Sequence, residues 1–421
     1  MIKRSFVGLT TPSFEYSVKD SSISGPQKVA PSKTVRLIIE SPFSRSIALK
    51  AGNEVKTGQR LSIGNAYAVS SATGKIASVE RYVNQAGKAC TAVVIEVAAS
   101  EQIDDAFVNA SRSNPRKAAL EFLANAPGNP PMSLFDEGKE LDTVVICIAD
   151  QDLEVVTQQQ VLEQSADAVQ KGIAAIKKIT GISNIVAAAP QNLMQKAGSI
   201  GASAKVISST YPAANPIWIM KDILGKVVPA GKSCEDLGVC ILSAEAVASI
   251  GKAFDEGNAP TEKTITVVKK NGSKLLVSAR IGTLFSDIFA AVGISVAGGD
   301  RIIVGGPLTG YAAYAEDQAV DAGTDAIMVQ GASDITPVSD YPCINCGECN
   351  RICPAKIQVN MLVRFCEAAK YEDAADLYDL YSCIDCGLCS YVCVSRIPIF
   401  QYIKLAKHEL ARMNTAEATN D

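Results

Sequence analysis

Residues 343–354 read CINCGECNRICP, and residues 383–394 read CIDCGLCSYVCV. Both stretches have the spacing C-x2-C-x2-C-x3-C, which is typical of thiolates that surround an iron–sulfur cluster. Gly347 and Gly387 follow the second cysteine of each run, where a residue without a side chain lets the backbone bend tightly around the sulfurs. Pro354 follows the first run, as this spacing expects, whereas Val394 follows the second. The sequence therefore predicts two [4Fe–4S] sites near the C-terminal end of the chain.

The spacing also predicts which cysteines share a cluster. In proteins with two such clusters, the fourth cysteine of each run binds the cluster of the other run. Zinc is a poorer fit because its structural sites use four ligands in pairs, and a c-type haem needs a histidine after C-x-x-C. On the two-cluster pattern, the ligands are Cys343, Cys346, Cys349 and Cys393 for the first cluster, and Cys383, Cys386, Cys389 and Cys353 for the second.

The composition is that of an ordinary globular protein. The 421 residues are 48% hydrophobic and 20% charged, with a net charge of −4. The length favours about three domains, and the charge balance gives no reason to expect a nucleic-acid partner. No apolar run reaches the ~18 residues of a membrane helix, and no signal-peptide stretch is present. We expect an intracellular protein that contacts a membrane only through partner proteins. The five cysteines outside the two runs are predicted to be buried packing thiols: Cys90, Cys147, Cys234, Cys240 and Cys366.

Three changes of pattern precede the cysteine runs. From 33 to 98, short β-branched runs separated by glycine turns predict an all-β domain. From 141 to 258, apolar strands alternate with amphipathic helices, which is typical of a parallel sheet covered on both faces. The pattern predicts a long helix from about Gln158 to Ile179 and, among the strands, 184–189 and 205–209. From 259 to 335, two alternating runs flank Asn271-Gly272, a strong hairpin signal. A helix and a strand follow this hairpin, in the order of a β-grasp domain.

The predicted fold class is therefore an α/β multidomain chain. It combines a β barrel-sandwich hybrid, a parallel α/β (Rossmann-like) domain, a β-grasp (soluble-ligand-binding) domain and a C-terminal helical, ferredoxin-like domain with two clusters. The predicted boundaries are an N-terminal arm at 1–32, the barrel-sandwich at 33–98, a linker at 99–140, the α/β domain at 141–258, the β-grasp domain at 259–335, the ferredoxin-like domain at 339–413 and a tail at 414–421.

The barrel-sandwich domain resembles the biotinyl and lipoyl carrier domains in two phrases, VKTGQRL (55–61) and ATGKIASV (72–79). Carrier domains present a modifiable lysine at the hairpin tip between these phrases. Here the tip reads IGNAYAVSS (63–71) and contains no lysine, while Lys75 follows a turn glycine in a different context. We interpret the domain as structural.

With the domains in this order, the chain resembles the C subunit of Rnf-type ion-translocating ferredoxin:NAD oxidoreductases, from about Lys33 to Met413. The resemblance implies association with a membrane through partner subunits. It also implies a β-grasp domain that binds a soluble ligand and, in many members, a flavin that accepts electrons from NADH. Besides the cysteine runs and the barrel-sandwich phrases, the stretches that carry the resemblance are 206–232, RIGTLFSDI (280–288), IIVGGPLTGY (302–311) and 389–407.

The chain departs from that family at the flavin site. Flavin-binding members have a loop of the form G-x-G-G-A-G-F-P-T before the α/β domain, whose glycines let the backbone approach phosphates. The equivalent segment here, 106–138, has no glycine cluster, and Gly128 stands alone. A second family loop, N-x-x-E-C-E-P, corresponds to CIADQDLEV (147–155), which keeps carboxylates at Asp150 and Asp152. These two carboxylates could serve a ligand site at the carboxyl end of a strand, or they could begin a helix, the interpretation that we favour.

Three interpretations of function follow. The first is an iron–sulfur electron-transfer subunit that relays single electrons through two [4Fe–4S] clusters in a membrane-associated, Rnf-like complex. The second is an FMN-dependent, NADH-oxidising subunit of such a complex, against which the missing glycines argue. The third is a ligand-binding adaptor with a vestigial redox role. The expected partners are the membrane subunits and a protein electron donor or acceptor, a ferredoxin or a cytochrome. The expected location is the cytoplasmic face of the plasma membrane.

Overall fold

The computed structural model describes residues 12–18, 23–30, 32–44, 47–136, 140–339 and 341–418. The chain forms two compact units. The scaffold unit comprises Tyr16–Ser209 and Cys234–Asp334, and the cluster unit comprises Met1–Glu15, Thr210–Ser233 and Ile335–Asp421. Much of the predicted N-terminal arm and the end of the predicted tail lie outside the described residues.

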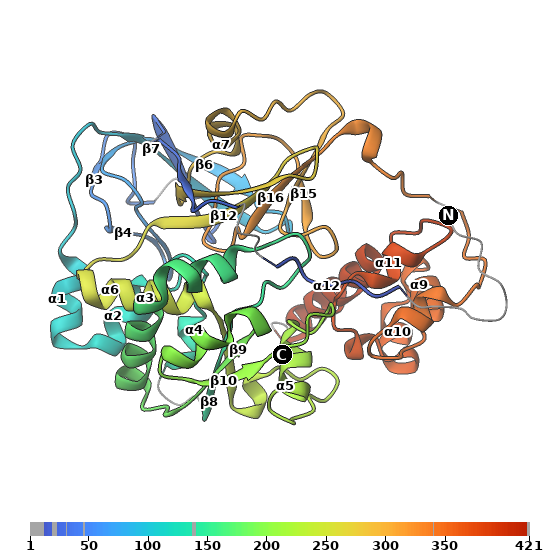
Figure 1. Cartoon of the computed structure of the whole chain (residues 1–421). Coiled ribbons are helices and arrows are strands. Elements are labelled where there is room, and N and C mark those ends of the chain that lie inside the picture. Colours follow the sequence, from blue (N-terminus) through green and yellow to red (C-terminus); the bar gives the residue numbers. More distant parts are fainter. Residues whose placement is uncertain are drawn as a thin grey trace. The chain divides into compact units, whose positions relative to one another are not determined.

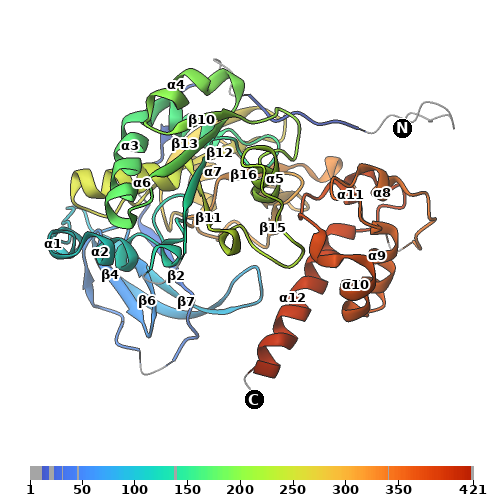
Figure 2. The same ribbon diagram turned by 90° about the horizontal axis from the view of Figure 1, so that it is seen from below.

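The first part of the scaffold unit is an all-β sandwich, drawn in blue in Figures 1 and 2. A four-stranded sheet has the order β2-β7-β6-β3, and β4 and β5 form a separate hairpin. Alternate residues of β2 are buried, as the period of a strand with one face on a core requires. The strands are β2 (Thr34–Ile39), β3 (Glu54–Val55), β4 (Arg60–Ile63), β5 (Ala66–Val69), β6 (Gly74–Val83) and β7 (Ala89–Val97).

The second part of the scaffold unit is a parallel sheet with the order β10-β9-β8-β11. Its three strand pairs are all parallel, as the alternation of strands and helices predicted. The five residues of β8 are all buried. The strands are β8 (Thr143–Cys147), β9 (Asn184–Ala189), β10 (Ser203–Val206) and β11 (Val239–Ser243), and the helices are α3 (Thr157–Thr180), α4 (Met194–Ser199) and α6 (Ala244–Glu256).

Helices α3 and α6 cross at very short range. A side-chain carbon on Gly172 of α3 would lie 2.0 Å from the carbonyl oxygen of Val247, and one on Gly251 of α6 would lie 2.0 Å from that of Ala168. Both glycines are therefore required by packing. The region predicted as a linker contains α1 (Ala106–Ser113), α2 (Pro115–Phe122) and a short 3-10 helix, Met132–Phe135.

The third part of the scaffold unit is a mixed sheet with the order β1-β13-β12-β16-β14-β15. The hairpin β12–β13 is antiparallel, and β12 pairs in parallel with β16. Gly272 adopts the positive φ of +78° that the Asn-Gly turn predicted. β1 belongs to the predicted arm and adds to the edge of β13. The elements are β1 (Gln27–Lys28), β12 (Glu262–Val268), β13 (Lys274–Arg280), α7 (Phe285–Val292), β14 (Arg301–Val304), β15 (Tyr311–Ala313) and β16 (Ala326–Gln330).

The cluster unit is helical, with its C-terminal helices in orange and red in Figures 1 and 2. Helices α8 and α11 pack together, and α9 packs against α10 and α12. Its apolar core contains Leu362, Val363 and Ile403, each fully buried. The helices are α5 (Pro216–Asp222), α8 (Glu348–Ile352), α9 (Val359–Glu367), α10 (Tyr371–Tyr378), α11 (Leu388–Val392) and α12 (Ile399–Ala418).

The segment Thr210–Ser233 belongs to a different unit from its neighbours in the sequence. Thr210–Ser233, expected within the α/β domain, groups with the cluster unit instead. The physical reason is a pair of hydrogen bonds to the second cysteine loop, from the Tyr211 hydroxyl to the Cys386 carbonyl (2.6 Å) and from Asn215 Nδ2 to the Ile384 carbonyl (2.8 Å).

Candidate iron–sulfur site

The two cysteine runs fold as two copies of one motif, related by a shift of 40 residues, as Asn345 and Asp385 show with the same positive φ of 56°. Gly347 and Gly387 both have φ of 74° and precede α8 and α11. The next pair, Lys356 and Arg396, also has positive φ, at 58° and 55°. Repetition at this level of backbone detail means that each half builds the same cysteine-bearing loop.

A side chain ties each loop to the helix that follows it. In the first half, Asn350 Oδ1 accepts from the Asn360 backbone N–H at 3.0 Å. In the second half, Ser390 Oγ accepts from the Phe400 N–H at 2.8 Å. These bonds satisfy amides at the starts of α9 and α12 that have no partner within the helix. They also fix the position of each fourth cysteine, which lies between the two bonded residues in the sequence.

The first predicted ligand set lies around one cavity. Cys343, Cys346, Cys349 and Cys393 all line it, so the structure brings the fourth cysteine of the second run to the first run. The cavity contains about 350 Å³ of empty space, including its open mouth. Its rim carries Ile344, whose exposed fraction is 66%. Cys346 is exposed, while Cys349 is buried.

The second set is more enclosed, because Cys353, Cys386 and Cys389 are buried and Cys383 is half-buried. Burial raises the pKa of Cys386 to about 11, and a charge on Cys353 contributes to the same rise. Cys353 of the first run is therefore within electrostatic range of Cys386 of the second. Burial also raises the pKa of Cys389 well above its usual value, with contributions from Cys383, Cys386 and, more weakly, Cys349 of the other set. The two sets are neighbours.

Burial makes some of the predicted ligand thiols weaker acids than an ordinary cysteine. Burial raises the pKa of Cys349 to about 11, and charges on Cys346, Cys343 and Cys393 add to the rise. Burial likewise raises the pKa of Cys383 to about 12. Because iron binds the thiolate, ligation at these positions must release protons, which the positive charge of the metal makes favourable.

The described residues contain no group of three or more His, Cys, Asp or Glu side chains that could hold a single metal ion. A single ion requires its ligands to converge on one point. The four thiolates around a cubane bind four different iron atoms at its corners and so stand further apart.

Asp150 and Asp152 are both occupied by contacts within the protein. Asp150 is buried and accepts from the Gln158 N–H (2.7 Å) in the first turn of α3 and from Gln159 Nε2 (3.1 Å). Burial raises the pKa of Asp150 to about 7, although these bonds act in the opposite direction. Asp152 accepts from the Thr309 N–H (2.7 Å) and hydroxyl (2.6 Å) in the loop after β14.

The segment that corresponds to the family's flavin loop packs closely against the start of α6. Gly128 has a positive φ, and a side-chain carbon there would lie 2.3 Å from the Ala246 nitrogen, so the backbone presses against the start of α6. The first amides of α6 are already bonded, Glu245 N–H to Gln158 Oε1 (3.0 Å) and Ala246 N–H to Ser243 Oγ (3.1 Å). Helix N-termini bind phosphates through such free amides, and these have internal partners.

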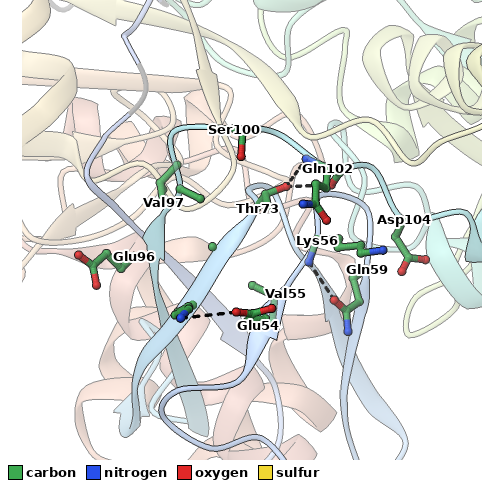
Figure 3. A pocket seen from close by; sticks show the side chains of 13 residues that line it. Glu54, Val55, Lys56, Gln59, Thr73, Glu96, Val97, Ser100, Gln102 and Asp104 are labelled. Atoms are coloured by element: carbon green, nitrogen blue, oxygen red, sulfur yellow. Dashed lines mark hydrogen bonds and ion pairs between the residues drawn. The ribbon is translucent and has the colours of Figure 1, made fainter.

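The sandwich domain contains a separate groove (Figure 3). It encloses about 1200 Å³ of space that is open to solvent. Glu54 and Lys75 form an ion pair across β3 and β6 at 3.5 Å, and Thr73 accepts from the Gln102 N–H at 2.8 Å. With Glu96 and Asp104 also in its lining, the groove mixes charges of both signs, and its charged side chains face water.

Comparison with known proteins identifies relatives of the chain. No protein-family model matches the chain. The chain is 27% identical over 402 residues to the C subunit of the proton-translocating ferredoxin:NAD(+) oxidoreductase complex of Clostridium ljungdahlii, across 89% of this chain and 87% of that protein. The chain is a homologue of the C subunit of ion-translocating oxidoreductase complexes. This confirms the resemblance predicted from the sequence.

Two further C subunits show the same relation. The chain is 27% identical over 405 residues to that of Serratia proteamaculans and 26% identical over 398 residues to that of Klebsiella pneumoniae, each across 88% of this chain. It covers 57% and 52% of those proteins, so it spans little more than half of their length. Among the described residues, no helix is long and apolar enough to cross a membrane.

Among solved structures, the chain is similar to NAD+-reducing [NiFe]-hydrogenase in the H2-reduced state, with a TM-score of 0.47 and 12% identity across 72% of this chain and 65% of that one. The air-oxidized state gives a TM-score of 0.45 and 11% identity across 64% and 56%. A likeness at this level is too distant to carry an argument about this C-subunit homologue.

Proposed function

We propose that the chain is the iron–sulfur electron-transfer subunit of a membrane-associated, Rnf-like complex and relays single electrons through two [4Fe–4S] clusters. The observation that carries this proposal is that Cys393 of the second run lines the same cavity as Cys343, Cys346 and Cys349 of the first. An electrostatic effect of Cys353 on the pKa of Cys386 supports the converse placement, of the first run's fourth cysteine near the second run. A chain that crosses over between two loops in this way places two ligand sets next to each other, as a relay requires.

Bound clusters would supply reversible one-electron chemistry at potentials set by burial, charge and hydrogen bonds to sulfur. The eight cysteines would hold them, and the protein's part is to fix the loops and exclude water. The second set is buried and the first is open at Ile344 and Cys346. Electrons would therefore exchange with a partner at the first set and pass inward to the second.

The iron content of anaerobically purified protein tests the proposal. The two-cubane signature predicts about eight irons and eight acid-labile sulfides per chain. Cys353→Ser should alter the spectrum of the cluster held by Cys383, Cys386 and Cys389 and leave the other unchanged. Cys366→Ser is the matched control, because Cys366 is also a buried cysteine of the cluster unit but is outside both runs. About four irons, or a change confined to the Cys343 cluster, would contradict the assignment.

An FMN-dependent, NADH-oxidising subunit is the second candidate, and one observation favours it. The side chain of Gln160, at the start of α3, is buried, and neither its amide oxygen nor its nitrogen has a hydrogen-bond partner among the described residues. Such groups call for an explanation, for example an unseen polar molecule. Against this candidate stand the occupied amides of α6 and the absence of a glycine cluster in 106–138.

A flavin titration separates the two candidates. Hydride transfer delivers two electrons, so a flavin must stand between NADH and one-electron clusters. The protein is incubated with excess FMN, freed of unbound flavin, and titrated with NADH under argon. We expect no retained flavin and no bleaching of the visible cluster absorption, which dithionite should bleach. Retained flavin together with cluster reduction by NADH would establish the second candidate.

The location and partners are part of the same proposal. We propose that partner subunits hold the chain at the cytoplasmic face of the plasma membrane and that a ferredoxin or cytochrome exchanges electrons with it. Expressed by itself, it should remain in the supernatant after high-speed centrifugation. Expressed with its partners, it should sediment with membranes and be released by alkaline carbonate. Membrane retention of the chain without partners would argue for an anchor instead.

A further inference from the structure

The two cysteine loops are alike in backbone but unlike in what surrounds them. Ile344 of the first loop has an exposed fraction of 66%, whereas its counterpart Ile384 in the second has 8%. The segment Thr210–Ser233 bonds to the second loop and groups with the cluster unit, although it lies more than 100 residues before that loop. We call this segment the strap.

Three side chains bond to backbone carbonyls of the second loop. The Tyr211 hydroxyl donates to the Cys386 carbonyl at 2.6 Å, and Asn215 Nδ2 donates to the Ile384 carbonyl at 2.8 Å. Lys407 Nζ of α12 donates to the Cys383 carbonyl at 2.7 Å. In the stretch from Cys383 to Cys386, which begins and ends with a predicted ligand of one cluster, three carbonyls are thus bonded by two strap residues and one helix residue.

The donors are themselves fixed. Tyr211 has an exposed fraction of 5%, and its N–H donates to the Phe14 carbonyl at 2.8 Å. Asn215 begins α5 and accepts from the Ile217 N–H through its side-chain oxygen, so its amide group is used at both ends. Lys407 is also held by Asp385, at 2.9 Å and 3.0 Å to the two carboxylate oxygens.

In the first loop, the corresponding hydrogen-bond donor to a backbone carbonyl is an exposed arginine. The carbonyl of Cys346, which corresponds to Cys386, accepts from Arg351 at 3.1 Å. Arg351 belongs to the adjacent helix α8, its side chain is 42% exposed, and it also pairs with Glu348. A water-exposed arginine is screened and mobile compared with a buried tyrosine hydroxyl. The electrostatic surroundings of the two loops therefore differ.

We propose that Tyr211, Asn215 and Lys407 are positioning residues that tune the second cluster separately from the first. The inference rests on the proposed two-cluster function. The hydroxyl, amide and ammonium groups all direct positive charge toward the second loop, and positive charge nearby favours the added electron of a reduced cluster. These residues hold the reduction potential of the second cluster above the value that the same loop would give without them, while the first cluster keeps the potential of an exposed site.

The experiment is an anaerobic redox titration followed by EPR, on the full chain with both clusters assembled. Cys346→Ser and Cys386→Ser first assign the two signals, since each replaces one predicted ligand of one set. Tyr211→Phe then removes only the hydroxyl. We expect the reduction equilibrium of the second cluster to fall about threefold, roughly half of the 59 mV that a tenfold change represents for one electron. The first cluster should not change.

Further variants separate an effect on the reduction potential from a purely structural effect. Asn215→Ser keeps a side chain that can begin α5 but is too short to donate to the Ile384 carbonyl, and Lys407→Met leaves Asp385 unpaired beside Cys383. Both should shift the second cluster in the same direction as Tyr211→Phe. Tyr378→Phe is the control, since it removes a hydroxyl from a ring that packs against Phe365 in the same unit.

The outcomes distinguish this inference from the proposed function. If the wild-type chain does not hold two clusters, the proposed function fails. If it holds two clusters and Tyr211→Phe shifts neither potential, or shifts both equally, the positioning role is wrong although the function stands. A lowered melting temperature with unchanged potentials likewise assigns the strap a purely bracing role and overturns the inference.

Discussion

Lys263 of β12 is a buried cation whose removal should have a large and pH-dependent effect. Its side chain is fully buried and forms ion pairs with Glu245 of α6 and with Asp325, the latter at 2.5 Å. Burial by itself lowers the pKa of Lys263, but the two carboxylates outweigh it and raise the pKa above its ordinary value. For Glu245, burial raises the pKa and Lys263 opposes the rise.

The size of the effect follows from what Lys263→Met leaves behind. Methionine fills a similar volume, so the main loss is the charge that compensates Glu245, whose side chain is 6% exposed. Breaking a buried ion pair by removing one partner costs about 3–5 kcal/mol. In a unit of this size each kcal/mol lowers Tm by roughly 2 °C, so Tm at pH 8 should fall by about 6–10 °C. At pH 5 the fall should be smaller, because Glu245 can then take up a proton.

Thermal unfolding under anaerobic conditions, followed by far-UV circular dichroism at both pH values, measures this effect. The double variant Lys263→Met with Glu245→Gln is the control, since it removes both charges and leaves a neutral amide. It should recover part of the loss at pH 8 and show a weaker dependence on pH. A single variant as stable as the wild type at pH 8, or a double variant that is equally destabilised, would refute this account of the pair.

Two further predictions concern the scaffold unit. Burial raises the pKa of Asp150 from 3.8 to about 7, so this group destabilises the fold progressively as pH rises from about 4 to about 7. The Tm advantage of Asp150→Asn over the wild type should therefore grow between pH 5 and pH 7.5. A difference in Tm that does not change with pH would contradict the raised pKa. Gly172→Ala should lower the free energy of unfolding by about 1–3 kcal/mol, because the new methyl group overpacks against Val247. Gly198→Ala, whose methyl group would meet nothing within 4 Å, should raise it by up to about 1 kcal/mol. Equal effects of the two variants on urea unfolding would mean that the helix crossing can relax.

Much of the local structure could be predicted because it depends on short-range pattern. The helix expected from Gln158 to Ile179 is α3, Thr157–Thr180, and the strand expected at 184–189 is β9 with the same bounds. The strand expected at 205–209 is β10, Ser203–Val206, which lies slightly earlier. The five cysteines expected to be packing thiols are all buried. In each case apolar periodicity, which follows from the repeat of the helix or strand, carries the information.

Only part of the candidate site could be predicted from the sequence. The cysteine runs can be recognised from their spacing, because the ligands of one cluster must follow one another at short and regular intervals. Asp150 and Asp152 were visible as carboxylates, but their partners were not. Asp152 bonds to Thr309, 157 positions away, and no periodicity links the two residues.

The sequence by itself determined the two cysteine loops, the parallel sheet and the Asn-Gly hairpin, since each is encoded by residues that are neighbours along the chain. Only the tertiary structure decided what surrounds the second loop. Tyr211 and Cys386 are separated by 175 positions and Asn215 and Ile384 by 169, and the strap carries helix-forming residues that fit an α/β domain equally well. The strap joins the cluster unit because its side chains donate to backbone carbonyls of the second loop, which need hydrogen-bond partners. The local sequence does not show which residues so far apart will form such a bond.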